Sequence, residues 1–229
     1  LALIKKDNPL PAICGRICNR RCEDACTRAT LDEAVAIDAV KRFVAERDLK
    51  VETRYIPKPT VPSLKGHFDE KIAIIGSGPA GLSCAYFLAD KGYQPVIFEK
   101  SDRPGGMLTY GIPPYKLEKD LIQAEIDVIK QMGVTIKCGV EVGKDVTIDQ
   151  LRAQGYKGFY IAIGCQGGRK PGIPGEDAEG VYTAVEFLRQ AGEKEAFDLG
   201  GDVIVVGGGN VAIDAARMSA RCSRGKVSM

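Results

Sequence analysis

The sequence lacks any long hydrophobic run, any excess of one charge and, apart from His67, any histidine. No apolar stretch approaches the ~20 residues of a membrane span and no signal peptide is visible, so we expect a soluble protein without a membrane partner. Its 32 basic and 30 acidic residues are spread along the chain and give a net charge of +2, which argues against a nucleic-acid surface. Because no ligand or acid pattern surrounds His67, we interpret it as an ordinary surface residue.

Length and cysteine usage narrow the class further. A chain of 229 residues that is 45% hydrophobic can bury a sizeable core and predicts one or two domains. Of its eight cysteines, four fall within residues 14–26. This density is typical of metal ligands in a reducing compartment rather than of a disulfide scaffold, and it predicts a cytoplasmic protein.

The stretch 71–100 predicts a strand, a glycine turn, a helix and a second strand without a break. Ile72–Ile75 is a short apolar, β-branched run of the kind buried in a parallel sheet. Gly76–Gly81 then opens a helix that ends at Gly92, and Gln94–Phe98 forms the second strand. The pattern is that of a dinucleotide-binding unit.

Each glycine of this turn has a separate physical role. Gly76 makes the tight turn, Gly78 lets the backbone approach a pyrophosphate, and Gly81 lets the helix pack closely on the strand. The phosphates then meet the helix N-terminus, where unpaired N–H groups favour anions. Glu99, about 20 residues further on, can accept hydrogen bonds from an adenosine ribose. A tight turn without a ligand is the alternative, which the flanking strand, helix and acid disfavour.

A second glycine-rich loop, Arg103–Pro113, follows the ribose acid directly, where NAD enzymes need none. Beyond it, Leu117–Met132 predicts an amphipathic helix and Val134–Cys138 the next strand. Thr147–Gln150 has the form of a capping box that opens a short helix. Gly158–Gly164 predicts a buried strand.

The chain lacks the cysteine pair that the flavin disulfide reductases need. They need a cysteine pair, usually in the loop after the ribose acid. Gly105–Lys116 contains no cysteine, and Cys165 has no second cysteine nearby. The sequence therefore argues against dithiol chemistry.

The pattern of strand, glycine turn and helix recurs at Asp202–Ala212. Gly207–Gly209 takes the place of the first glycines, and Ala212 is the variant that the fingerprint allows at the third. A second nucleotide site is predicted, with a structural turn as the alternative. The helix is expected to run to about Cys222, and Lys226–Met229 to start the next strand, whose end would hold the residue that chooses NAD from NADP.

Four cysteines near the start of the chain, Cys14, Cys18, Cys22 and Cys26, recur at a constant interval of four residues. A continuous helix would spread them over about 18 Å, far more than one iron–sulfur cube can bridge. Either the backbone bends or the cysteines serve two clusters. Zinc sites usually pair cysteines as CxxC, and buried free cysteines do not recur at fixed intervals, so iron–sulfur is favoured over both.

The segments around these cysteines connect them to the first nucleotide unit. The chain starts at Leu1 in what we interpret as the end of a helix, so we expect the natural N-terminus to be missing. Asp32–Asp48 predicts a helix. Tyr55–Pro62 is too rich in proline for a helix or a central strand and is interpreted as a linker.

The chain resembles the glutamate synthase small-subunit family, which includes the flavin-bearing N-terminal region of dihydropyrimidine dehydrogenase and ferredoxin-linked NADP oxidoreductases. The matching segments are GSGPAGLSCAYFLADKGYQPVIFEK, RPGGMLTYGIP and PAICGRICNRRCEDAC. The resemblance implies FAD at the first nucleotide site and NADPH or NADH at the second. The implied FAD-binding residues are Gly76, Gly78, Pro79, Ala80, Gly81, Glu99, Lys100, Gly106, Met107, Leu108, Gly111, Ile112, Val140 and Gly164. The implied NAD(P)H-binding residues are Gly207, Gly209, Asn210, Val211 and Ala212.

The resemblance also implies [4Fe–4S] clusters held by these cysteines. In that family two clusters share ligands from two cysteine motifs, and the earlier motif is absent here. Cys18, Cys22 and Cys26 are the implied metal ligands. Cys14 is a fourth candidate, because Lys41 aligns where the family often has a Gln or Glu ligand and a protonated amine cannot bind iron. The cysteines not expected to bind iron are Cys84, Cys138, Cys165 and Cys222.

The predicted fold class is α/β, with two Rossmann-like dinucleotide-binding units, the second truncated, after a small α-helical iron–sulfur domain. We expect the chain to be an internal part of a longer flavoprotein. The expected boundaries are 1–50 for the helical [4Fe–4S] domain, 51–69 for the linker, 70–176 for the FAD domain and 177–229 for the NAD(P) domain.

The function implied by the resemblance is that of an electron-input module. NAD(P)H would give a hydride to FAD, and single electrons would pass through [4Fe–4S] clusters to a partner. The partner is expected to be a large catalytic subunit, as in glutamate synthase, or a ferredoxin-like acceptor. No side-chain acid, base or nucleophile is required, since the cofactor does the chemistry. A ferredoxin–NADP reductase or pyrimidine reductase subunit is the alternative, and a non-catalytic assembly fragment is another.

Overall fold

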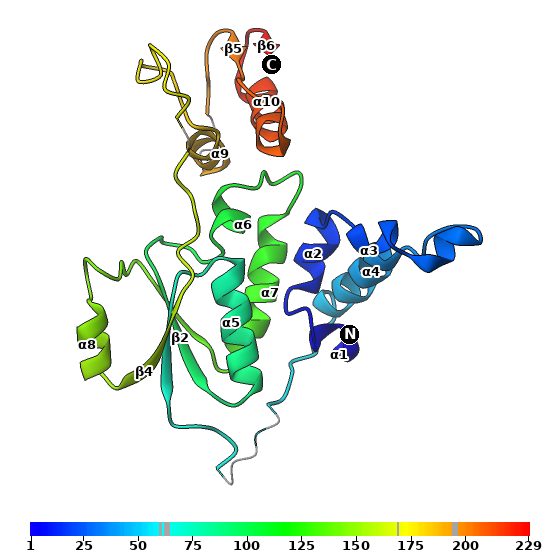
Figure 1. Ribbon diagram of the computed structural model, residues 1–229, viewed down its shortest axis with the longest axis vertical. Coiled ribbons are helices and arrows are strands. Elements are labelled where there is room, and N and C mark those ends of the chain that lie inside the picture. The colour runs from blue at the N-terminus through cyan, green and yellow to red at the C-terminus, as the bar shows by residue number, and fades with distance from the viewer. Residues whose placement is uncertain (60, 62–64, 169, 194–196) are drawn as a thin grey trace. The chain divides into compact units, whose positions relative to one another are not determined.

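The computed structural model describes residues 1–59, 61, 65–168, 170–193 and 197–229. They form two compact units (Figure 1). Unit 1 comprises Leu1–Gly105 and Lys116–Ile163, and unit 2 comprises Gly106–Tyr115 and Gly164–Met229. Part of the expected linker, residues 60 and 62–64, lies outside the described residues, and the domain boundaries stay predictions.

Unit 1 is built on a parallel four-stranded sheet with the order β3-β2-β1-β4. Its strands are β1 (Lys71–Ile75), β2 (Gln94–Glu99), β3 (Thr135–Cys138) and β4 (Tyr156–Ile161). The chain leaves β1 toward β2 and β3 on one side and returns on the other side as β4. The carboxyl end of β1 is therefore a topological switch point, the place where open α/β sheets bind ligands.

Helices cover both faces of this sheet, with α5 (Pro79–Asp90) and α7 (Lys119–Gln131) on one face and α8 (Ile148–Ala153) on the other (Figure 1). Alternation along the strands explains this, because neighbouring side chains point to opposite faces. Ala73 and Phe98 pack in one cluster with Leu151 of α8. The predicted capping box is confirmed, since Thr147 accepts from the backbone N–H of Gln150 and Gln150 accepts in return.

One prediction about the sheet is wrong, because the strand within 158–164 is only partly buried. Tyr160 is 43% exposed and Ile161 is 66% exposed. The described part of β4 pairs with β1 alone, so it is the edge strand of this sheet. An apolar run cannot by itself distinguish an edge strand from a central one.

Before the sheet, unit 1 contains a set of short helices. They are α1 (Ala2–Lys5), α2 (Pro11–Ile17), α3 (Arg21–Asp24), the 3₁₀ helix η1 (Thr27–Thr30) and α4 (Ile37–Leu49). The prediction of a helix from Asp32 is wrong for its first turn, since α4 begins at Ile37. The Asp32 carboxylate accepts from the N–H of Glu33 and pairs with Arg28, a local arrangement that competes with a helical backbone.

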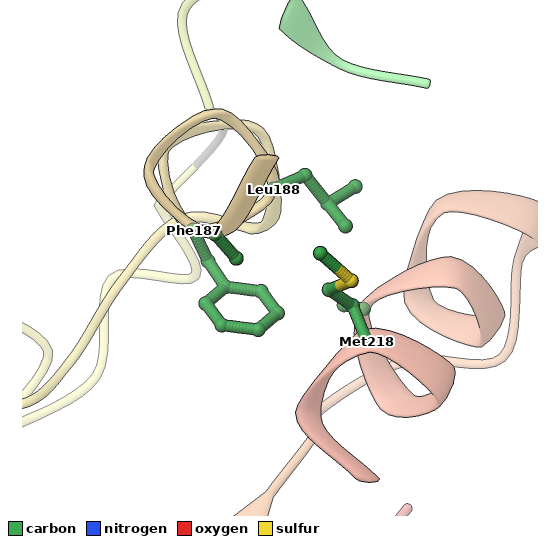
Figure 2. Close-up of a cluster of buried hydrophobic side chains, with 5 residues drawn as sticks. Phe187, Leu188 and Met218 are labelled. Carbon is green, nitrogen blue, oxygen red and sulfur yellow. The ribbon is translucent and has the colours of Figure 1, made fainter. Parts of the chain in front are cut away.

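The helices and strands of unit 2 are α6 (Met107–Tyr110), α9 (Ala184–Glu193), β5 (Val203–Ile204), α10 (Asn210–Cys222) and β6 (Val227–Ser228). Among them, β5, α10 and β6 form a second strand–helix–strand motif. The strands β5 and β6 pair in parallel, as the second dinucleotide-binding unit predicts. Figure 2 shows the core of unit 2, where Phe187 and Leu188 of α9 meet Met218 of α10.

Within the described ranges, every helix is too short or too polar to cross a bilayer.

Candidate cofactor and cluster sites

The first glycine turn begins directly after β1 and leads into α5. Gly76 has a φ of +102°, in the region that favours glycine, and a Cβ there would collide with the carbonyl oxygen of Ala162. A Cβ at Gly81 would collide with the carbonyl oxygen of Gly76. At Gly78, in contrast, a Cβ would meet no protein atom within 4 Å. The fold therefore requires glycine at Gly76 and Gly81, whereas Gly78 leaves open space that a ligand can occupy.

The N-terminus of α5 presents its backbone to this open space. Gly78 is the N-cap and provides no side-chain cap, and Pro79 occupies the first turn without an N–H to satisfy. Pro79 and Ala80 are exposed. Unpaired N–H groups of a first helical turn, together with the helix dipole, favour a phosphate group. The turn therefore fits the pyrophosphate of a dinucleotide.

Glu99 ends β2 beside this turn and is only 6% exposed. Its carboxylate accepts from the N–H of Ser77 at 2.9 Å, from the Ser77 hydroxyl, and from the N–H of Ser101 at 2.8 Å. Burial raises the pKa of Glu99, but these hydrogen bonds together hold that pKa below its usual value. An ionised carboxylate fixed at this place can accept from ribose hydroxyls.

Ser77 is a residue that sequence reasoning missed. Besides contacting Glu99, it accepts from the N–H of Gly105, through its hydroxyl at 3.1 Å and its carbonyl at 3.1 Å. It therefore ties the first glycine turn to the start of the second. The variable position of the glycine fingerprint gives no signal for this contact, since many residue types occupy it.

Two further predicted FAD residues of unit 1 lie near Glu99. The N–H of Val140 donates to the carbonyl of Glu99 at 2.9 Å, and the Val140 side chain packs against the cluster on the α8 face. Lys100 is exposed directly after β2. The structure thus gathers these residues with Gly76–Gly81 at the carboxyl end of the sheet.

The predicted FAD residues of the second loop belong to unit 2. Gly106, with a φ of +55°, is the N-cap of α6, and Leu108 is buried. A Cβ at Gly111 would collide with the Met107 side chain, and the N–H of Ile112 donates to the Met107 carbonyl at 3.0 Å. Gly164, the remaining predicted residue, is exposed and has a φ of +68°.

The second nucleotide turn repeats the geometry of the first. Gly207 has a φ of +130°, in the region that favours glycine, although a Cβ there would make only an ordinary contact, 3.5 Å from the Cβ of Ala212. Gly209 is the N-cap of α10, and a Cβ there would meet no protein atom within 4 Å. Asn210 and Val211 are exposed in the first turn. This helix end also fits a dinucleotide phosphate.

The cysteine segment bends instead of forming one helix. Cys14 lies in α2, Cys18 is its C-cap with an extended backbone, Cys22 lies in α3 and Cys26 is the N-cap of η1. Arg20 takes a left-handed conformation between the two helices. Among the described residues, no three His, Cys, Asp or Glu side chains meet as a metal site. Of the two alternatives, the bend is observed, but it does not bring the thiols to one point.

The donors around these thiols nevertheless suit cluster ligands. The N–H of Arg20 donates to the Sγ of Cys18 at 3.4 Å. Backbone N–H groups of Val35 and Arg28 lower the pKa of Cys26. Hydrogen bonds to sulfur stabilise a thiolate and tune a bound cluster. By contrast, burial raises the pKa values of the isolated cysteines Cys84, Cys138 and Cys222.

Lys41 has a partner that keeps its ammonium group away from a ligand role. Its Nζ lies 2.7 Å from the Asp38 carboxylate, which is almost fully buried. Burial raises the pKa of Cys14, and the nearby Lys41 lowers it. The fourth ligand position therefore stays a prediction for Cys14.

The cysteine segment packs directly against the first nucleotide unit. Glu125 of α7 is 1% exposed and accepts from the N–H of Ala12 at 3.2 Å and of Ile13 at 2.9 Å, both in the first turn of α2. The Tyr86 hydroxyl of α5 donates to the carbonyl of Lys5 at 2.7 Å. Sequence patterns could not reveal these contacts, because they join residues about a hundred positions apart.

Comparisons with known proteins agree with this geometry. Residues 70–229 match the pyridine nucleotide-disulphide oxidoreductase family. The chain belongs to that family. Residues 1–53 match dihydropyrimidine dehydrogenase domain II, which has a 4Fe-4S cluster. The predicted cofactors FAD, NADPH and [4Fe–4S] are those that these two matches support.

Curated relatives align with nearly the whole chain. It is 41% identical over 240 residues to the NADP(+)-dependent formate dehydrogenase subunit beta of Moorella thermoacetica, covering 96% of this chain and 34% of the relative. It is 35% identical over 233 residues to the glutamate synthase [NADPH] small chain of Escherichia coli, and this match covers 96% of this chain and 48% of that relative. The chain thus spans a third to a half of these relatives' length.

A solved structure with the same fold is FprA from Mycobacterium tuberculosis in complex with NADPH. Its TM-score is 0.51 at 27% identity, over 65% of this chain and 36% of that one. The resemblance to the glutamate synthase small-subunit family and the α/β fold class are confirmed.

Proposed function

We propose that this chain is the electron-input module of an NAD(P)H-dependent flavin and iron–sulfur oxidoreductase. A hydride enters from NAD(P)H at the second nucleotide unit, and electrons leave singly through [4Fe–4S] clusters to a partner subunit. The observation that carries the proposal is the packing of the cysteine segment on α7, next to the first nucleotide unit, through the Glu125 contacts to α2. A cytoplasmic location fits thiolates that need a reducing compartment.

The residues of unit 1 have positioning roles in this function. The open side of Gly78 admits the pyrophosphate to the N–H groups at the start of α5. Glu99, kept ionised by Ser77 and Ser101, accepts from the ribose. Bound FAD supplies the conversion of a hydride into single electrons, so the protein contributes binding and orientation.

The identity of the partner subunit is a separate and more specific part of the proposal. We propose the glutamate synthase large subunit, which would reduce the imine formed from 2-oxoglutarate and ammonia. The relatives also include a formate dehydrogenase subunit beta at 41% identity. Co-purification of the intact protein from its natural source decides between them: a bound glutamate synthase large subunit supports the proposal, and a formate dehydrogenase subunit or another acceptor contradicts it.

The substitution Gly209→Val in the intact protein tests the direction of electron entry. A Cβ there would meet no protein atom within 4 Å, and the side chain would occupy the place of the dinucleotide phosphate. We expect a variant that keeps its FAD and its dithionite-reducible flavin but is no longer reduced by NADPH. Anaerobic spectra of the flavin provide the measurement.

The control is Gly201→Val, since Gly201 lies in the same unit and also has open space around its Cβ. Rapid NADPH reduction of the Gly209→Val protein would contradict the assignment of the second unit.

A further inference from the structure

The segment Gly106–Tyr115 is anchored on the helices of the second nucleotide unit. α6 contacts α9, and the Arg189 guanidinium of α9 lies 4.8 Å from the centre of the Tyr110 ring. Tyr115 packs against the hydrophobic cluster formed by α9 and α10. The segment that is predicted to line the flavin is therefore held by the element that is predicted to bind NAD(P)H.

Tyr115 makes the most specific of these contacts. Its ring lies 4.5 Å from the Arg217 guanidinium and 4.4 Å from that of Arg221, both on α10. Its hydroxyl donates to the Asp214 carboxylate at 3.4 Å, and Asp214 is only 9% exposed. Burial and the Asp214 charge raise the pKa of Tyr115, so the hydroxyl stays protonated and able to donate. A guanidinium cation over the face of an aromatic ring is attracted to that ring electrostatically.

These three partners share one helix with the predicted nucleotide site. Asp214, Arg217 and Arg221 follow at intervals of three and four residues, which places them on one face of α10. The same helix starts at Asn210, beside the N-cap Gly209. A rigid helix of 13 residues therefore connects the dinucleotide phosphate site to the Tyr115 contact.

We propose that Tyr115, held by Asp214, Arg217 and Arg221, is a positioning residue that sets the flavin-lining segment relative to the nicotinamide-binding helix. This inference rests on the proposed function. Hydride transfer needs reacting atoms about 3–3.5 Å apart, and a displacement of about 1 Å can slow such a step about a hundredfold. The anchor matters for the rate of transfer and leaves the affinity for either cofactor to other residues.

The test compares Tyr115→Ala and Tyr115→Phe in the intact protein, with Tyr182→Ala as the control for loss of a tyrosine that is 42% exposed in the same unit. We expect Tyr115→Ala to slow flavin reduction by NADPH about tenfold to a hundredfold in stopped-flow measurements. FAD content, NADP⁺ affinity and flavin reoxidation by ferricyanide should not change. Tyr115→Phe keeps the ring next to both guanidinium groups and should recover much of the rate.

Hydrogen exchange of the backbone amides in 106–115 gives a readout that does not depend on turnover. Exchange should be faster in Tyr115→Ala than in Tyr182→Ala or the unchanged protein. If Tyr115→Ala does not fold, the double variant Arg217→Ala/Arg221→Ala, which leaves the tyrosine, should show the same slow reduction and fast exchange.

Three results would overturn the inference: a rate reduced less than about tenfold, loss of FAD in parallel with the rate, or unchanged exchange. Failure of the proposed function looks different, because the unchanged protein would then show no reduction of its flavin by NADPH at all. The exchange comparison still decides the anchor in that case.

Discussion

Gly78 is the glycine of the first turn that ligand binding requires and the packing of the fold does not. A Cβ at Gly76 or Gly81 would collide with backbone oxygens, whereas one at Gly78 would meet no protein atom within 4 Å. We therefore expect Gly78→Val in the intact protein to abolish FAD retention, while it lowers the melting temperature of the FAD-free protein less than Gly76→Val or Gly81→Val does. Flavin content and thermal unfolding, measured together, check this.

Gly167→Val is the matched control, since Gly167 is exposed and equally open. It should retain FAD. Full flavin occupancy of Gly78→Val would mean that the first unit does not bind the pyrophosphate as assigned.

At the scale of single residues, the sequence predicted those whose role is local. Gly76, Gly78 and Gly81 follow from the chemistry of one turn, and the capping box of Thr147 from one helical turn. Ser77 and Tyr115 escaped prediction, since their roles depend on partners 22 and 99 residues away. A local sequence pattern does not predict contacts between residues so far apart in the chain.

At the scale of elements, α7 is the helix that joins the cysteine segment to the nucleotide unit. Its buried Glu125 accepts from two N–H groups at the start of α2. We expect Glu125→Ala to destabilise the intact protein by about 1–3 kcal/mol for each N–H left without an acceptor. Glu125→Gln keeps one oxygen and should cost less. Chemical denaturation curves provide the measurement.

The control for Glu125 is Glu179→Ala, which removes an exposed carboxylate from unit 2. If Glu125→Ala were as stable as that control, the contact between α2 and α7 would not contribute to the fold. Iron content measured on the same samples shows whether the cysteine segment also depends on this contact.

Element type was predictable where the sequence pattern was clear, from a short apolar run in β1 and from amphipathic helical spacing in α7. The two wrong predictions have different causes, one in the tertiary context of a strand and one in a local hydrogen bond. β4 has the composition of a buried strand but lies at a sheet edge in the described residues. α4 begins at Ile37 because the Asp32 side chain bonds the local backbone instead.

For the whole molecule, the proposed function requires one order of electron flow, from NADPH to the flavin and then to the clusters. Unit 1 holds the cysteine segment and the first nucleotide turn, and unit 2 holds the second turn. A path that bypasses the flavin would leave the first turn without a role in electron transfer.

The most direct test is anaerobic mixing of NADPH with the intact Gly78→Val protein after reconstitution of its clusters, with cluster reduction followed by electron paramagnetic resonance. The account predicts that the FAD-free variant keeps clusters that dithionite reduces and NADPH does not, while in the unchanged protein NADPH reduces the flavin first and the clusters afterwards. Cluster reduction by NADPH in the FAD-free variant would contradict it.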